Sequence, residues 1–211
     1  MFHTLAYVLP HAKADRMASL TANDWALAAL ETLGVGGVAA VRVEVLARDL
    51  GVTKGSYYHH FKNRRAVLEL AVQMWEDIAT EQVIIQVNAS SGDPRARLLR
   101  LARATFLESG RADAIESAIR EWASADTDVA QVVARVDARR LGYVEDMLCE
   151  AGVGQPGLRA ELFYRTLIGE FVWRRHGGPA LSAEAIELLV GMALTDAEPV
   201  RGGDGSREIP C

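Results

Sequence analysis

The chain is 211 residues long, half of them hydrophobic and 24% charged, a balance that allows a substantial core and argues against a disordered protein. It contains no uncharged apolar run of about 18 residues, and its first 20 residues lack the basic start of a signal peptide, so we expect a soluble cytoplasmic protein without a membrane span. The net charge of -5 argues weakly against nucleic acid as a partner.

That charge is unevenly distributed along the sequence. Residues 1–65 contain eight Lys and Arg against five Asp and Glu, whereas the remainder contains fifteen against 23. All three lysines and four of the five histidines also lie in the first part. We therefore expect an N-terminal module with an anionic partner and a C-terminal module with another task.

Helical periodicity extends over most of the chain, and the alternation typical of strands is nearly absent. Four N-terminal helices are predicted, at residues 21–34, 42–50, 54–61 and 64–87. Gly51 is expected to close the second helix as a left-handed cap, and Asn63 to cap the fourth. Five more helices are predicted after a loop at 88–94, at residues 94–106, 115–122, 126–149, 158–175 and 182–194. The fold class is therefore all-α, with about nine helices.

The stretch LARDLGVTKGSYYHHF (46–61) has the pattern of a helix-turn-helix: a short helix, a turn that begins with glycine, and a second short helix rich in polar rings. Small residues at the start of the second helix would let its backbone approach a groove wall. Tyrosine and histidine can donate hydrogen bonds to phosphate oxygens. Lys62 and Arg64 flank the end of this helix, where long cations can neutralise phosphates.

The phase of the second helix separates its inner and outer faces. Tyr57 and Phe61 are four residues apart, so we expect them to be core residues that brace the helix from inside, and Tyr58 to point outward. The adjacent pair His59 and His60 could suggest a metal, but neighbouring residues on a helix point about 100° apart and no third ligand is near. We predict no metal site and no cofactor.

The sequence ALAALETLGVGGVAAVRVEVLARDLGVTKGSYYHHFKNRRAVLELA resembles the DNA-binding domain of the TetR family of bacterial regulators over about residues 20–72. Its most specific part is GVTKGSYYHHFKNR. The resemblance implies a two-domain, all-helical homodimer, with an N-terminal three-helix DNA-binding domain and a variable C-terminal helical domain. In the family, that second domain binds a small effector and releases operator DNA.

The resemblance also implies domain boundaries and DNA contacts. We expect a flexible arm at 1–18, a DNA-binding domain at 19–66 with the helix-turn-helix at about 42–61, an effector-binding and dimerisation domain at 67–198, and a flexible tail at 199–211. The family's contact positions correspond here to Arg42, Glu44, Lys54, Gly55, Ser56, Tyr58, His59, His60 and Arg64. Threonine is common in the family where Arg42 stands, so a direct phosphate contact is expected there in place of a helix cap.

No comparable resemblance covers residues 90–211, so the effector is inferred from the residues. Large apolar side chains with few lone charges nearby predict a cavity for a hydrophobic small molecule, lined by Trp75, Phe106, Trp122 and Met147.

The last two predicted helices are apolar around more of their circumference than one core face requires, which predicts a homodimer interface. The residues expected there are Phe163, Leu167, Ile168, Phe171, Leu189 and Met192, with Leu162 and Val172 on the same helix as the first four. Gly169 and Gly191 are small enough to let helices approach closely.

Three readings compete with a ligand-responsive repressor. An enzyme is disfavoured because GVGG (34–37) is followed by neither a strand nor Lys-Ser/Thr, and we predict no catalytic residue. A transcriptional activator of the same family stays open, because nothing in the binding domain encodes the consequence of binding. A helical adaptor that does not bind DNA also stays open, and salt-sensitive DNA binding would separate it from a regulator.

Overall fold

The structure is a computed structural model that describes residues 20–89, 92–107 and 110–195. Within these ranges it contains helices and turns and no strand, so the predicted all-α class is confirmed. The predicted arm (1–18) and tail (199–211) lie outside the described residues. Contacts divide the chain into two compact units. Unit 1 comprises the described residues up to Glu81 together with 110–135, and unit 2 comprises the rest.

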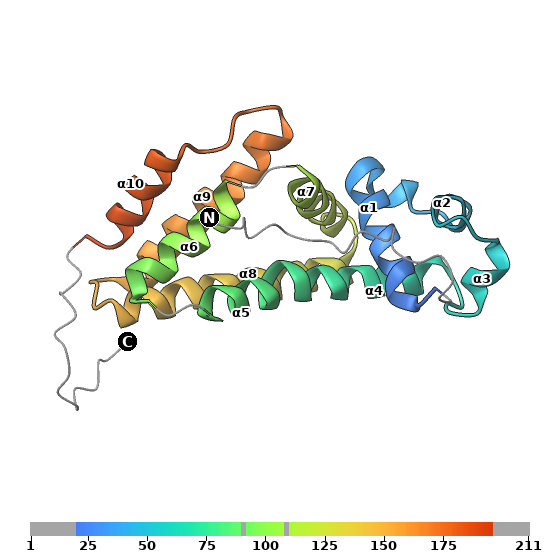
Figure 1. The fold of residues 1–211 in the computed structure, drawn as a ribbon, viewed down its shortest axis with the longest axis horizontal. Helices are drawn as coiled ribbons and strands as arrows, with labels where there is room; N and C mark the ends of the chain where they lie inside the picture. Colours follow the sequence, from blue (N-terminus) through green and yellow to red (C-terminus); the bar gives the residue numbers. More distant parts are fainter. Residues whose placement is uncertain (1–19, 90–91, 108–109, 196–211) are drawn as a thin grey trace. The chain divides into compact units, whose positions relative to one another are not determined.

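Unit 1 carries the helix-turn-helix (Figure 1). Its elements are α1 (Ala22–Ala40), α2 (Val43–Asp49), α3 (Lys54–Tyr58), α4 (Arg64–Glu76), a π-helical segment (Asp77–Glu81), α7 (Arg111–Ala123) and the part of α8 (Thr127–Glu150) that precedes residue 136.

Unit 2 contains the remainder of α8 with the C-terminal helices. Its other elements are α5 (Gln82–Ala89), α6 (Pro94–Phe106), α9 (Pro156–Arg175) and α10 (Ala183–Ala193). Because α4, the π-helical segment and α5 follow one another without interruption, they correspond to the single helix predicted at 64–87. Counted in this way, the described residues form nine helices, as predicted.

Two helix ends differ from prediction. The first helix continues to Ala40, beyond its predicted end at Gly34, because only Gly37 leaves the helical conformation (φ 69°, ψ -178°) and the helix resumes after it. Helix α3 ends at Tyr58 and not at Phe61, although the N–H of Phe61 still donates to the carbonyl of Tyr57 at 3.0 Å.

The capping signals around the helix-turn-helix lie where they were predicted. Gly51 has a φ of 70°, and the N–H groups of Gly51 and Val52 donate to the carbonyls of Arg48 and Ala47, which is the hydrogen-bond pattern of a Schellman motif. The side chain of Asn63 accepts from the N–H of Ala66 at 3.0 Å and so begins α4. These two caps fix where the turn ends and where α4 starts.

Tyr57 is the aromatic centre around which the helix-turn-helix is packed. Its ring is fully buried, with ring centroids 5.2 Å from Trp25 of α1 and 5.2 Å from Phe61. Its hydroxyl donates to the carbonyl of Asn63 at 2.8 Å. Tyr58, one residue on, is 62% exposed. The predicted phase of the recognition helix, with Tyr57 and Phe61 inside and Tyr58 outside, is therefore confirmed.

Helix α7 packs closely against α1 within unit 1. A Cβ atom added at Gly34 would lie 2.9 Å from the side chain of Ile115 and 3.3 Å from its backbone nitrogen, so a larger residue could not be accommodated without a shift. An ion pair between Arg111 and Glu31 (2.8 Å) joins the same two helices.

The core of unit 2 is formed by apolar side chains from all five of its helices. A buried ion pair on α9 accompanies it: the carboxylate of Glu170 lies 3.9 Å from the guanidinium of Arg174 and accepts the N–H of Leu181 at 3.1 Å. Arg174 in turn donates to the carbonyl of Phe106. Among the described helices, none is both long and apolar enough to cross a bilayer.

Replacing Tyr57 by alanine should lower the free energy of unfolding by about 3 kcal/mol or more, because a fully buried aromatic ring leaves a cavity. Tyr57→Phe should cost only about 1 kcal/mol, since it removes one hydrogen bond and keeps the ring. Tyr58→Ala is the matched control and should change stability by less than about 0.5 kcal/mol. Urea unfolding of the three variants measures this order, and an equal loss at both tyrosines would contradict the packing described.

Candidate nucleic-acid interface

The outer side of α3 and of the turn that follows it presents five polar side chains to solvent. We call them the recognition surface: Lys54, Tyr58, His59, His60 and Lys62, all exposed. Gly55 is also exposed, and Ser56 is half-buried. No apolar side chain interrupts this set, because Tyr57 and Phe61 turn into the core. Donors and rings thus gather on a face without a hydrophobic partner, as groove contact requires.

Lys54 is held by an acidic residue from the preceding helix. Its ammonium lies 2.8 Å from the carboxylate of Glu44 on α2, and both side chains are 58% exposed. The hydrogen bond from Lys54 holds the pKa of the Glu44 carboxyl below its ordinary value, with the lysine charge acting in the same direction. Two predicted DNA contacts are therefore paired with each other, and Lys54 must exchange this carboxylate for any phosphate that it contacts.

Arg42 is the N-cap residue of α2, and its side chain makes no capping hydrogen bond. The residue is exposed, which leaves its guanidinium accessible as the predicted phosphate contact requires. Lys62 is also exposed, and its ammonium forms no hydrogen bond or ion pair within the described part of the chain. Among the predicted cationic contacts, these two are less engaged than Lys54 and Arg64.

Arg64 has a structural partner that sequence reasoning missed. Its guanidinium donates hydrogen bonds to the carbonyl oxygens of Val38 and Val41, at the C-terminal end of α1. The arginine thus satisfies carbonyls that the end of a helix leaves without intrahelical donors. No local sequence signal connects residues 23 and 26 positions apart, so this role could not be read from the motif. A DNA contact by Arg64 stays a prediction.

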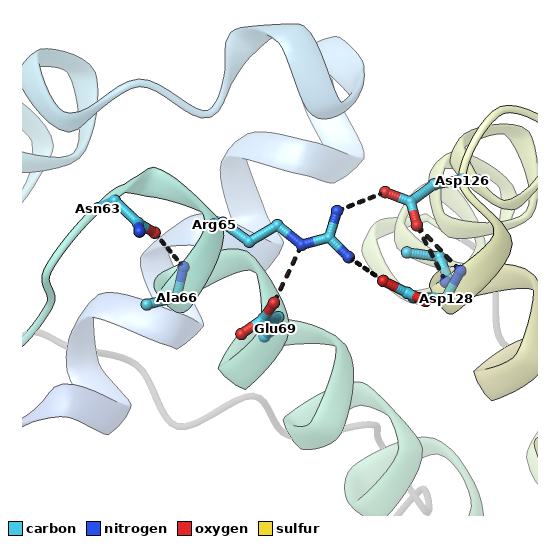
Figure 2. Close-up of polar contacts among 7 residues, drawn as sticks. Asn63, Arg65, Ala66, Glu69, Asp126 and Asp128 are labelled. Atoms are coloured by element: carbon cyan, nitrogen blue, oxygen red, sulfur yellow. Dashed lines mark hydrogen bonds and ion pairs between the residues drawn. The ribbon is translucent and has the colours of Figure 1, made fainter.

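Arg65 is a second residue that the motif did not indicate. It stands beside Arg64 and Lys62 in a short basic run, which suggests a phosphate contact. Its guanidinium instead lies among three carboxylates, those of Glu69, Asp126 and Asp128 (Figure 2).

The four predicted effector-binding residues have different surroundings. Trp75 is buried in unit 1, where its indole N–H donates to the carboxylate of Glu116 at 3.0 Å, and Trp122 of the same unit is half-buried. In unit 2, Phe106 and Met147 are buried in the same apolar cluster, and the Phe106 ring packs edge-on against Phe163 at 5.6 Å. That these residues line a ligand cavity stays a prediction.

The predicted dimer residues fall into three groups. Phe163 and Leu167 are buried in the core of unit 2, and Ile168, Phe171 and Leu189 are partly buried against it. Met192 is 63% exposed. Exposed apolar side chains also include others on the same two helices, namely Leu158, Leu162, Val172, Trp173 and Leu188. We call these five with Met192 the apolar α9–α10 surface.

The N-terminal part of the chain is similar to a known protein family. Residues 27–71 match the family model described as bacterial regulatory proteins, tetR family. This segment runs from α1 into α4 and includes the whole helix-turn-helix. No curated protein is significantly similar in sequence.

Solved structures extend the likeness to most of the chain. A transcriptional regulator from Rhodococcus sp. Rha1 superposes with a TM-score of 0.71 at 19% identity, covering 86% of this chain and all of the other. A Saccharomonospora viridis protein in complex with choline gives 0.70 at 14% identity, covering 83% and 95%. AibR, in complex with isovaleryl coenzyme A and operator DNA, gives 0.56 at 21% identity, covering 80% and 97%.

At these identities the solved structures establish the fold, and the family model identifies the helix-turn-helix. The predicted architecture, an N-terminal helix-turn-helix domain followed by a C-terminal helical domain, is confirmed. Residues 27–71 therefore contain a helix-turn-helix of the kind that the tetR family model describes, and the chain has the fold of solved transcriptional regulators.

Proposed function

We propose that this chain is a DNA-binding transcriptional regulator of the tetR family, and more closely a ligand-responsive repressor that binds a palindromic operator as a homodimer. The observation that carries the proposal is the phase of α3, which turns Tyr57 and Phe61 inward and leaves Lys54, Tyr58 and the histidines to solvent. A helix with this division can enter a major groove with its polar side while its apolar side stays packed on α1. AibR, which shares the fold, was solved with operator DNA.

The predicted DNA contacts, which include Arg42 as well as the recognition surface, divide into two kinds. Lys62, Arg42 and the hydroxyl of Tyr58 suit phosphate oxygens, which fix register without reading sequence. Lys54 lies on the short helix, and His59 and His60 lie in the turn directly after it; all three suit acceptors on base edges, with Gly55 and Ser56 allowing close approach. In a dimer, the two recognition helices would meet half-sites about 34 Å apart, one turn of DNA.

The homodimer is proposed to form through the apolar α9–α10 surface. Six large apolar side chains exposed on two helices are more than a monomer's surface normally leaves to water. Gly169 and Gly191 add a second argument: neither has a positive φ, and a Cβ atom at either position would meet nothing within 4 Å. Neither glycine is thus required by its own chain, whereas close approach of a partner helix would require both to be small.

Two helices from each subunit would then form a four-helix bundle around a two-fold axis. An obligate interface of this type buries on the order of 2,000 Å² or more. Phe163 and Leu167 belong to the core of unit 2, so they would hold α9 in place without contacting the partner subunit.

The effector is proposed to be a hydrophobic small molecule. The proteins solved with choline and with isovaleryl coenzyme A share this fold and bind different small molecules, which supports an effector without identifying it. Phe106 and Met147, both of unit 2, are almost completely shielded from solvent, so an apolar ligand in contact with them would be kept away from water. Binding of the effector and of DNA would be reciprocally coupled.

Lys62→Met should weaken binding to the operator about equally for all sequences and lower the slope of log affinity against log salt by about one. Arg64→Met is the matched comparison: because Arg64 engages carbonyls of α1, its loss should lower thermal stability, whereas Lys62→Met should not. The duplex is obtained by selection from a random library with wild-type protein. If wild type enriches no duplex, or binds without dependence on salt, the proposed DNA contact is wrong.

Leu162→Arg should dissociate the dimer and with it abolish operator binding, because the charge would be buried without a partner. Ile85→Arg on α5 is the control, since Ile85 is 57% exposed and lies outside the apolar α9–α10 surface. Sedimentation at micromolar concentration distinguishes the two variants. A wild-type monomer, or a dissociated variant with full affinity for the operator, would rule out this interface.

A hydrophobic effector should raise the melting temperature and lower affinity for the operator together. A panel of apolar and aromatic compounds, screened by thermal shift and then by DNA binding, tests this coupling. Trp122→Ala should weaken the response to the active compound, because its half-buried ring is the most accessible of the four predicted residues. If a broad panel changes neither quantity, the effector-gated role loses its support.

A further inference from the structure

Arg65 connects the beginning of α4 to the beginning of α8 (Figure 2). Its Nη1 lies 2.9 Å from Oδ2 of Asp126, and its Nη2 lies 2.6 Å from Oδ2 of Asp128. Its Nε donates to Glu69, one turn further along α4, at 3.0 Å. Every nitrogen of the guanidinium is thus directed at a carboxylate, and two of the three carboxylates come from a helix more than 60 residues away in sequence.

The same carboxylate that binds Arg65 also begins α8. Oδ1 of Asp126 accepts the N–H groups of Asp128 (3.1 Å) and Val129 (3.3 Å), while Oδ2 accepts from Arg65. Desolvation opposes ionisation of Asp126, but these hydrogen bonds and the arginine charge outweigh it and hold its pKa below the ordinary value. The first turn of α8 and the contact with α4 therefore depend on one side chain.

On its other side, Arg65 is two residues from Asn63, which lies between the helix-turn-helix and α4. Asn63 caps α4 through its side chain and accepts the hydroxyl of Tyr57 through its carbonyl. A short path of covalent and hydrogen bonds thus joins the start of α8 to α3, by way of Asp126, Arg65, Asn63 and Tyr57. Helix α8 continues without interruption to Glu150 and so extends into unit 2, which bears the apolar α9–α10 surface.

The alternative role for Arg65 is a phosphate contact like that expected of Lys62. The residue is exposed enough for this, with 45% of its side chain accessible. Three carboxylates surround the one guanidinium, however, so the cluster keeps an excess of negative charge that would repel a phosphate. The charge of Arg65 is therefore used within the protein.

We propose that Arg65 is a positioning residue for DNA binding. Its two ion pairs, with Asp126 and Asp128, hold the recognition surface in one orientation relative to α8; we call this pair of contacts the Arg65 fork. The inference rests on the proposed operator binding by a dimer. Without the fork, the recognition surface would sample further orientations relative to α8. The apparent affinity for DNA would then fall in proportion to the fraction of molecules that still have the orientation able to bind. Asp126 and Asp128, although negatively charged, would thus favour binding of a polyanion.

The test compares Arg65→Met, Asp126→Asn and Asp128→Asn on the duplex selected with wild-type protein. Asparagine is nearly as good an N-cap as aspartate, so Asp126→Asn keeps the first turn of α8 and removes the charge. If Arg65 acts by positioning, Arg65→Met and Asp126→Asn should each weaken binding to the duplex by about fivefold. The double variant Arg65→Met with Asp126→Asn should bind no more weakly than Arg65→Met alone, because both changes remove the same contact. The dependence of affinity on salt should keep its wild-type slope.

A direct phosphate contact predicts the opposite pattern. Arg65→Met would then lower the salt slope by about 0.9, while Asp126→Asn and Asp128→Asn would tighten binding by removing negative charge near the DNA. Tighter or unchanged binding by both aspartate variants would overturn the proposal. Arg65→Lys should be intermediate, because a lysine keeps the charge but cannot form the fork.

Arg135→Met is the matched control, because Arg135 also makes a two-pronged ion pair between α8 and α4, with Glu76 at 2.7 and 2.8 Å, but at the other end of α4. It should change operator affinity by less than about twofold, and an equal weakening would overturn the special role of Arg65.

Hydrogen exchange at the amides of Asp128 and Val129 supplies a measurement that needs no DNA. Arg65→Met should accelerate it if the fork exists in solution. If wild type binds no duplex while Arg65→Met still accelerates this exchange, the proposed function is wrong and the fork is a purely structural contact. If Arg65→Met leaves the exchange unchanged, the fork does not exist in solution and the proposal is wrong.

Discussion

Burial of the Tyr57 ring is the constraint on which the helix-turn-helix depends. The ring packs against α1, and its hydroxyl binds the carbonyl of Asn63, whose side chain begins α4. One side chain therefore determines both which residues of α3 face solvent and where the next helix starts. A helix of five residues has too few backbone hydrogen bonds to persist alone, so tertiary packing must hold it. The polar face of the recognition surface is a consequence of this anchoring.

Much of the helix-turn-helix could be predicted from sequence because its determinants are local. Gly51 must adopt a positive φ, Asn63 must cap, and Tyr57 and Phe61 must share a face, and each of these follows from neighbours within a few residues. The partners of Arg64 and Arg65 could not be found in this way. Their acceptors lie on α1 and α8, and no periodicity or motif records which carbonyl or carboxylate a long side chain will reach.

The apolar face of α9 illustrates a different limit of sequence reasoning. When a helix is hydrophobic around most of its circumference, its sequence does not indicate which part faces its own core. Phe163 and Leu167 and the neighbouring Leu162 were predicted as one surface, yet the first two are buried and Leu162 is 69% exposed. Only the packed neighbours of α9, chiefly α6 and α10, separate the two sides.

The close approach at Gly34 has a consequence for how such regulators can be recombined. Because α1 touches α7 at this glycine without room for a side chain, residues around Ile115 are part of the surroundings in which the DNA-binding helices fold. A chimera joined directly after the helix-turn-helix would place a foreign α7 against Gly34, and any bulkier or differently placed neighbour would disturb α1. A graft that transfers α7 and the first turns of α8 together with the N-terminal helices keeps this contact intact. The part of the chain that must be transferred as a whole is therefore discontinuous in sequence.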